Sequence, residues 1–189
     1  QRCIELPNVK AIGIGEGERT IVDFAEAIQT KAPLSSVKGI WYKDHAGKVH
    51  RNQPQELINI DKSVPDFSLF DSQRFVRPMG GRIFRTFPVE TYRGCPYLCT
   101  FCNSPMQREL SKSNGTGNFL RRKSLKKLYR ELRDLQKLHD PEFFYFVDDS
   151  FLARPKKEIT DLCEVYKEIK LPFWFNTRPE NCTSQNLHQ

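Results

Sequence analysis

Three cysteines lie close together in the segment RGCPYLCTFC, which runs from Arg93 to Cys102. Cys95, Cys99 and Cys102 have the spacing CxxxCxxC. Thiolates are soft ligands that suit zinc or an iron–sulfur cluster. A structural zinc site normally closes with four protein ligands, whereas this segment supplies three. The spacing therefore predicts a metal centre that either takes a fourth ligand from elsewhere in the chain or keeps one coordination position open.

A fourth zinc ligand would have to come from a distant part of the chain; the available side chains are Cys3, His139, Cys163 and Cys182. Cys163 follows Leu162 on the apolar face of a predicted helix, so a core position is its simpler interpretation. We assign no role to Cys3 and Cys182. A four-iron cluster held by three cysteines leaves one iron free for an outside ligand, so three thiolates are a sufficient set.

The cysteine segment resembles the signature of the radical S-adenosylmethionine family, CxxxCxΦC, in which the aromatic position Φ is matched by Phe101. The resemblance implies a 4Fe-4S cluster whose open iron chelates the amino and carboxylate groups of S-adenosylmethionine. An electron from the cluster would break the C–S bond and yield a 5'-deoxyadenosyl radical. In the family the aromatic residue lies near the adenine, and we expect this of Phe101.

Two polar motifs follow predicted strands. FVDDSF resembles an acidic strand-end motif of cobalamin-dependent and methylthiotransferase-like members, which makes Asp148 and Asp149 candidates for binding the cofactor's amino group. FNTRPE is similar to a segment of the same members, and Asn176 or Arg178 would reach the ribose or carboxylate. The alternative for the two aspartates is an ordinary helix cap or turn at a strand end.

A glycine-rich loop near the start of the chain lies between a short apolar strand and a helix, in IGIGEGERTIVDFAEAI. Thr20 and Asp23 predict a capping pair for this helix. The segment resembles the last strand and helix of a cobalamin-binding domain, so Gly15 and Gly17 are candidate cofactor-binding residues. The alternative is a tight turn, because an isolated glycine motif is weak evidence.

The order of elements predicts an α/β fold. GIWYKDHAGKVHRN reads as a hairpin. A strand region that begins near Arg82 and runs into the cysteine loop, and strands over 143–147 and 173–176, alternate with amphipathic helices, one of them over Ser124 to His139. This order predicts a parallel sheet whose carboxyl ends gather the ligand groups. With the resemblance, we expect the end of a Rossmann-like cobalamin-binding domain, then the front half of a partial (β/α)6 TIM-type barrel of the radical S-adenosylmethionine type.

The expected domain ranges are 1–53 for the cobalamin-domain part with the hairpin, 54–80 for a Pro-rich linker, and 81–189 for the N-terminal half of the catalytic domain. Ser111 to Asn118 is expected to be a mobile loop. The first residue is Gln1 and the resemblance starts late in its first domain, so we expect a fragment of a longer protein.

The composition indicates a folded protein outside the membrane, with 38% hydrophobic and 12% aromatic residues and no apolar run of spanning length. The six cysteines occur without export features, which favours reduced thiols and a cytoplasmic location. Ten Lys or Arg and three Asp or Glu between Arg108 and Lys137 account for the whole net charge of +7. This basic stretch could attract nucleic acid, but an amphipathic helix needs a solvated face in any case.

The resemblance implies an enzyme that performs cobalamin-type methyl transfer or a related radical reaction. It also implies a reductant such as flavodoxin or ferredoxin, with cobalamin as a further candidate cofactor. No residue of the chain is assigned a catalytic role. Two alternatives are a tRNA methylthiotransferase of the same family and a zinc-stabilised module that binds nucleic acid through the basic helix.

Overall fold

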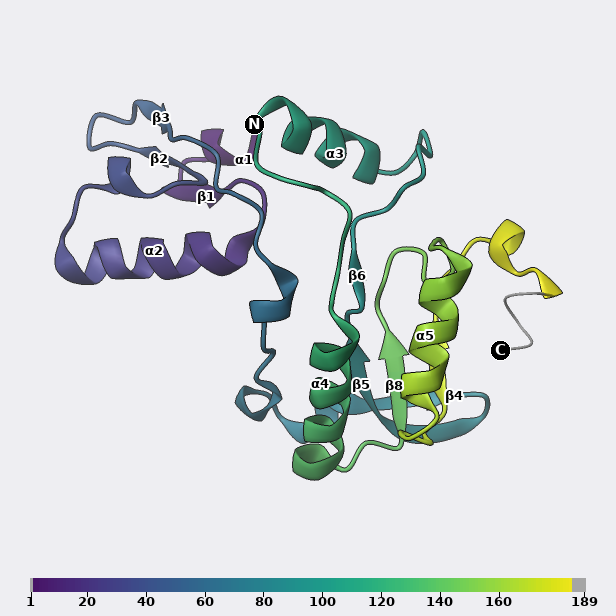
Figure 1. Ribbon diagram of the computed structural model, residues 1–189. Helices are drawn as coiled ribbons and strands as arrows, with labels where there is room; N and C mark the ends of the chain where they lie inside the picture. Colours follow the sequence, from purple (N-terminus) through teal and green to yellow (C-terminus); the bar gives the residue numbers. More distant parts are fainter. Residues whose placement is uncertain (1, 185–189) are drawn as a thin grey trace. The chain divides into compact units, whose positions relative to one another are not determined.

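A computed structural model describes residues 2–184, which form two compact units (Figure 1). The first unit comprises the chain up to Ile58 together with Pro105–Phe119, and the second comprises Asn59–Ser104 together with the chain from Leu120 onward. The units differ from the predicted domain ranges in two respects. Residues 105–119 join the first unit, and most of the predicted linker joins the second.

The first unit is built on a three-stranded antiparallel sheet in the order β1-β2-β3. The predicted hairpin is confirmed as β2 and β3, with Trp41 opposite Arg51. Helix α2 lies along the sheet in Figure 1, and its Ala27 is buried with Val37 and Ile40. The elements of this unit are α1 (Arg2–Glu5), β1 (Ala11–Gly13), α2 (Gly17–Thr30), β2 (Ile40–Lys43), β3 (Val49–Arg51) and most of α3 (Ser104–Ser113).

The predicted cap of α2 is wrong. The helix begins at Gly17, so Thr20 lies inside its first turns, where it is buried. Glu16 occupies the position before the helix without capping it, because its carboxylate accepts the backbone N–H of Ile58 at 2.9 Å. The sequence motif therefore misplaced the helix start by several residues.

The second unit contains a four-stranded sheet in the order β4-β5-β8-β9. Strands β5, β8 and β9 are parallel, as the sequence predicts, and α4 and α5 connect them. Figure 1 shows both helices beside β5 and β8. The elements of the sheet and its connections are β4 (Val76–Met79), β5 (Arg82–Val89), α4 (Leu125–His139), β8 (Phe143–Phe146), α5 (Lys156–Tyr166) and β9 (Phe173–Phe175).

Strand β4 falls within the predicted linker and pairs antiparallel with β5. The turn between them is Gly80-Gly81, with φ angles of 55° and 77°. Glycine adopts positive φ without steric cost, and a Gly-Gly pair between two β-rich segments is a hairpin signal. The linker prediction missed this signal.

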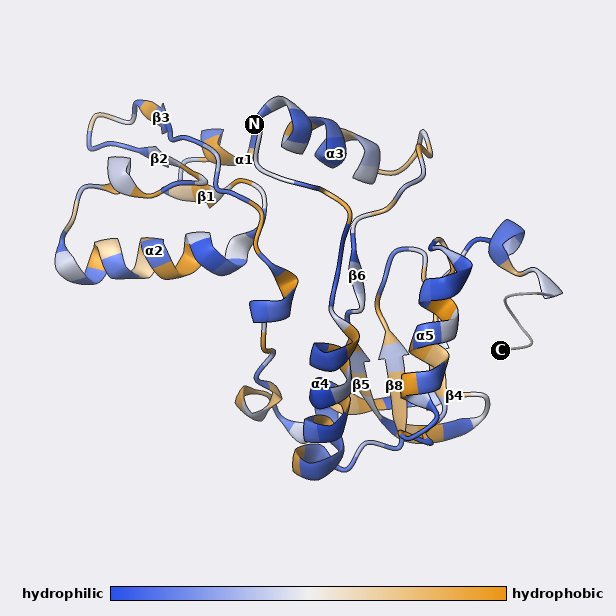
Figure 2. Cartoon of the chain, in the orientation of Figure 1, coloured by the Kyte–Doolittle hydropathy of each residue, from blue (hydrophilic) through white to orange (hydrophobic). Residues whose placement is uncertain are grey.

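The core of the second unit lies between the parallel sheet and the two helices. Leu128, Leu132 and Leu135 of α4 are buried in it, while Leu138 is 75% exposed. Most of α4 is coloured hydrophilic in Figure 2, because Lys and Arg occupy its solvent face. Ser124, the first residue of the predicted helix, is its cap and accepts the N–H of Lys127 at 3.3 Å.

Shorter elements complete the chain. The sequence did not predict α3, and the segment expected to be a mobile loop begins within it, where Ser111 is buried and its hydroxyl lies 3.0 Å from that of Thr116. No helix among residues 2–184 is both long and apolar enough to span a bilayer. The short strands and 3-10 turns are η1 (Leu34–Ser36), η2 (Ile60–Lys62), η3 (Phe67–Leu69), η4 (Ser72–Phe75), β6 (Tyr92–Arg93), β7 (Arg121–Arg122) and η5 (Pro179–Asn181).

Candidate functional site

The three cysteines lie on the loop that follows β6, just beyond the carboxyl end of the first parallel strand. Cys95 and Cys99 are half-buried and Cys102 is exposed. The backbone N–H of Cys102 donates to the carbonyl of Cys99 at 3.1 Å, which closes a tight turn between them. The position of the loop and this turn bring the three thiols to the carboxyl edge of the parallel sheet, where ligands bind in folds of this type.

Hydrogen-bond donors lie beside the sulfur atoms of the loop. The backbone N–H of Ser104 lies 3.4 Å from Cys102 Sγ, and Arg178 Nη1 lies 3.6 Å from Cys99 Sγ. The Ser104 hydroxyl is buried and has no hydrogen-bond partner in the described part of the chain. Burial raises the pKa of the Cys95 thiol. Hydrogen-bond donors around sulfur are typical of thiolate ligands of metal centres, so this loop fits a soft metal centre.

No group of three His, Cys, Asp or Glu side chains within residues 2–184 is arranged to hold a single metal ion. A 4Fe-4S cluster does not require such convergence, because each thiolate binds a different iron. The three-thiol donor set and its N–H partners are compatible with such a cluster.

The cysteine loop exposes two large apolar side chains. Phe101 is 93% exposed, and Leu98 is 69% exposed. Large apolar side chains at the surface often mark a binding site when they occur together. The loop thus presents an accessible ring and an aliphatic side chain beside its thiols.

Asp148 lies at the carboxyl end of β8 and is 2% exposed. Its Oδ1 accepts the backbone N–H groups of Thr91 at 2.7 Å and Tyr92 at 3.0 Å. Its Oδ2 accepts the Thr91 hydroxyl and Arg154 Nη2, the latter at 2.7 Å. Both carboxylate oxygens of Asp148 are therefore occupied within the protein, by long-range contacts to Thr91 and Tyr92 and by Arg154.

Asp149 and Asn176 have different surroundings. Asp149 is exposed as a residue, but partial desolvation of its carboxyl, with further contributions from Asp148 and Glu90, raises its pKa. Asn176 Nδ2 donates to the Tyr145 hydroxyl at 2.7 Å. Of the two adjacent aspartates, Asp149 is the one with an accessible carboxyl.

Arg178 is the strand-end residue that the structure brings to the cysteine loop. In addition to the contact with Cys99, its guanidinium carbon lies 4.2 Å from the centroid of the Tyr97 ring. The Tyr97 hydroxyl donates to Asn181 Oδ1 at 2.7 Å. Segments about 80 positions apart in the sequence are therefore joined at this site.

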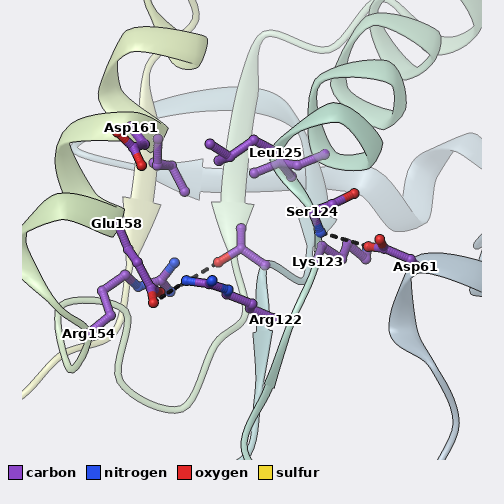
Figure 3. A pocket seen from close by; sticks show the side chains of 11 residues that line it. Asp61, Arg122, Lys123, Ser124, Leu125, Arg154, Glu158 and Asp161 are labelled. Atoms are coloured by element: carbon purple, nitrogen blue, oxygen red, sulfur yellow. Dashed lines mark hydrogen bonds and ion pairs between the residues drawn. The ribbon is translucent and has the colours of Figure 1, made fainter.

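A cavity of about 310 Å³ lies beside the Asp148 network and is shown in Figure 3. Its walls include Arg122, Arg154, Glu158 and Asp61. These charges have partners within the wall, since Arg122 pairs with Glu158 and Asp61 accepts the N–H of Ser124 at 2.7 Å. A cavity whose charges are already paired has little electrostatic attraction for a charged cofactor.

The glycine loop lies in the first unit. Gly15 has a φ of 89°, a backbone conformation that strongly favours glycine, and Gly17 is the first residue of α2. Gly15 also lines a cavity of about 220 Å³ with Gln55, Gln107 and Asn114. The turn alone explains the glycine at position 15, and its assignment to a cofactor stays a prediction.

Sequence reasoning missed Thr91 and Arg154, the partners of Asp148. Neither belongs to a spaced motif, and they lie 57 and 6 positions from Asp148. A buried polar network of this kind is defined by tertiary contacts between residues that share no sequence motif. The sequence therefore carried no signal for it. The assignments of the cysteines, Phe101, Asp149, Asn176 and Arg178 to cofactors stay predictions.

Comparison with known proteins gives relatives along most of the chain, although no family model matches. The chain is 30% identical over 160 residues to an uncharacterized methyltransferase of Pyrococcus horikoshii, covering 82% of this chain and 31% of that protein. It is 29% identical over 183 residues to the anaerobic magnesium-protoporphyrin IX monomethyl ester cyclase of Rubrivivax gelatinosus, covering 92% of this chain and 30% of that protein. The chain spans less than a third of these relatives.

Solved structures share the fold. The cobalamin-dependent S-adenosylmethionine radical enzyme OxsB aligns with a TM-score of 0.64 and 24% identity, over 93% of this chain and 24% of that one. The radical S-adenosylmethionine methyltransferase TsrM of Kitasatospora setae aligns with a TM-score of 0.60 and 15% identity, over 94% of this chain and 34% of that one. With the cysteine signature, these similarities lead to one conclusion. The chain has the fold of solved cobalamin-dependent S-adenosylmethionine radical enzymes.

Proposed function

We propose that Cys95, Cys99 and Cys102 hold a 4Fe-4S cluster that binds S-adenosylmethionine through its open iron. The observation that carries this proposal is the loop of three thiols at the carboxyl end of the parallel sheet, with N–H donors beside its sulfur atoms. When bound and reduced, the cluster would supply the electron for cleavage of S-adenosylmethionine to a 5'-deoxyadenosyl radical.

The protein groups around the loop would orient the cofactor. Phe101 is free to place its ring against the adenine, and Asp149 has an accessible carboxyl for the amino group. The network of Asp148, Thr91 and Arg154 would act indirectly, by fixing the backbone between β5 and the cysteine loop. Pre-organisation of this kind reduces the cost of ordering a site when the cofactor binds.

The reaction of the whole protein is proposed to be methyl transfer of the cobalamin type or a related radical step. This rests on relatives that carry methyltransferase names, including the cytidylyl-2-hydroxyethylphosphonate methyltransferase of Streptomyces wedmorensis, 25% identical over 201 residues. OxsB has been solved with aqua-cobalamin and S-adenosylmethionine, and TsrM with cobalamin and a 4Fe-4S cluster. Gly15 and Gly17 are the residues proposed to lie toward cobalamin. We further propose a cytoplasmic location and a flavodoxin or ferredoxin as reductant.

One observation favours a second candidate, a methylthiotransferase-like enzyme acting on tRNA. The solvent face of α4 carries Lys126, Arg130, Arg133 and Lys137, all exposed. Such a face attracts phosphates, and the affinity it gives falls steeply with salt. Salt-dependent binding of tRNA that is lost when Lys126 and Arg130 are replaced by Ala would favour this candidate over the first.

Anaerobic reconstitution with iron and sulfide tests the proposal. The expected result is about four irons per chain, a broad visible absorption, and a spectral change when S-adenosylmethionine is added. Replacing any one of the three cysteines by Ala should abolish cluster binding. A single tightly bound zinc without iron would contradict the proposal and support a zinc-stabilised module.

Cys163→Ala is the matched control. Cys163 packs against the core of the second unit, and burial raises the pKa of its thiol. Its replacement should retain all the iron and lower the free energy of unfolding by about 1 kcal/mol. Loss of iron from this variant would show that the core assignment of Cys163 is wrong.

A further inference from the structure

A short segment after β9 holds the cysteine loop in place. It begins with Arg178, whose Nη1 lies 3.6 Å from Cys99 Sγ and whose guanidinium carbon lies 4.2 Å from the Tyr97 ring centroid. Both contacts are made to the stretch between Cys95 and Cys102. The cationic group therefore lies directly beside one sulfur atom of the predicted ligand set.

Several contacts fix this guanidinium. Its Nη2 forms an ion pair with Glu180, which also raises the pKa of Arg178. The Tyr97 ring on which it stacks is anchored through its hydroxyl to Asn181 at 2.7 Å. Asn181 Nδ2 in turn donates to the Ser150 hydroxyl at 3.3 Å, beyond the end of β8. The cysteine loop is thus held by the carboxyl ends of two neighbouring parallel strands.

The position of the charge has a consequence for electron transfer. The reduction potential of an iron–sulfur cluster depends on its net charge and on hydrogen bonds to its sulfur atoms. A guanidinium that donates to a cysteine sulfur stabilises the reduced cluster more than the oxidised one, because reduction adds negative charge. Glu180 opposes this effect, because its negative charge lies next to the same guanidinium.

We propose that Arg178 is a positioning residue that sets the reduction potential of the cluster through its contact with Cys99. The negative charge of Glu180 partly offsets the effect of Arg178 on this potential. This role rests on the proposed binding of the cluster by the three cysteines. It differs from the sequence-based expectation for Arg178, which assigns it to the ribose or carboxylate of S-adenosylmethionine.

The test is a dye-mediated redox titration of the reconstituted full-length protein, followed by the electron paramagnetic resonance signal of the reduced cluster and performed without S-adenosylmethionine. Arg178→Gln should make the cluster harder to reduce by about tenfold in the equilibrium constant, or about 59 mV more negative for a one-electron couple. Arg178→Lys keeps the charge and should recover part of the shift. Glu180→Gln should shift the potential in the opposite, positive direction.

The outcomes distinguish an effect of Arg178 on the reduction potential from a role in binding S-adenosylmethionine. A potential in Arg178→Gln equal to that of the wild type, at equal iron content, would overturn the proposal, and so would loss of the cluster from both Arg178 variants. A wild-type potential without S-adenosylmethionine, combined with weaker cofactor binding, would assign Arg178 to the cofactor instead. Failure of the wild-type protein itself to take up iron would refute the proposed function, which is a distinguishable result.

Discussion

The guanidinium of Arg154 donates to the carboxylate of Asp148 at 2.7 Å, and the two side chains are only 5% and 1% exposed. The same carboxylate accepts the backbone N–H of Thr91, so it joins the end of β8 to the segment that follows β5. Removing one partner of a buried ion pair leaves a charge without compensation. The pair is therefore expected to matter for stability as well as for the shape of the site.

Arg154→Met should lower the free energy of unfolding by about 3 to 5 kcal/mol, because the Asp148 carboxylate would remain buried without its cation. Urea denaturation followed by circular dichroism measures the change. Lys157→Ala is the control, since Lys157 is 83% exposed in its pair with Asp161. It should change stability by less than about 0.5 kcal/mol. Equal effects of the two substitutions would contradict the predicted importance of the buried pair.

The second buried pair joins Lys123 to Glu131 of α4 at 2.8 Å, with side chains 1% and 7% exposed. Lys123→Met alone should lower the free energy of unfolding by about 3 to 5 kcal/mol. The double variant Lys123→Met with Glu131→Leu should lose less than the single variant, because no unpaired charge remains. A double-mutant cycle by urea denaturation checks this. Additive losses would mean that the two side chains do not interact.

Two leucines of α4 make a matched comparison. Leu132 is completely buried and Leu138 is 75% exposed, although both fit the apolar periodicity of the helix. Leu132→Ala should lower the free energy of unfolding by about 2 to 5 kcal/mol, because it removes buried methyl groups and leaves a cavity. Leu138→Ala should leave the unfolding midpoint nearly unchanged. A larger loss at Leu138 would show that α4 buries a different face.

A hydrogen bond in the hairpin of the first unit predicts that the stability of the protein depends on pH in the acidic range. His50 Nε2 lies 2.8 Å from Asp44 Oδ2, and this hydrogen bond, with help from the N–H of Lys48, lowers the pKa of Asp44. A carboxyl with a lowered folded pKa stabilises the fold above its unfolded pKa of about 3.9, and this contribution is lost as the pH falls through the folded pKa.

Asp44→Asn should therefore have a lower unfolding midpoint than the wild type at neutral pH. The difference between the two midpoints should become smaller as the pH is lowered. Thermal unfolding midpoints at a series of pH values, from neutral to strongly acidic, measure it. His50→Gln should behave in the same way, because it removes the main cause of the shift. A difference that stays constant across the series would exclude the predicted linkage.

Local patterns predicted the elements that are long and periodic. The leucine spacing predicted α4 over Ser124 to His139, within one residue of the observed start, because a helix of that length with one apolar stripe has few alternatives. The strand and helix order also gave the parallel arrangement of β5, β8 and β9. The short elements were predicted less well. Strand β4 was taken as linker, because the prolines at 54, 65 and 78 hid a four-residue strand that pairs with β5.

The sequence by itself determined the spacing of Cys95, Cys99 and Cys102, and with it the kind of metal centre that we propose for the loop. Such a motif is local, because its ligands lie within eight positions of one another. Only the tertiary structure decided that Arg178 lies beside Cys99, and that Asp148 is occupied by Thr91 and Arg154. These contacts join strand ends far apart in the sequence, and they arise because parallel pairing brings the carboxyl ends of β5, β8 and β9 to the same edge of the sheet.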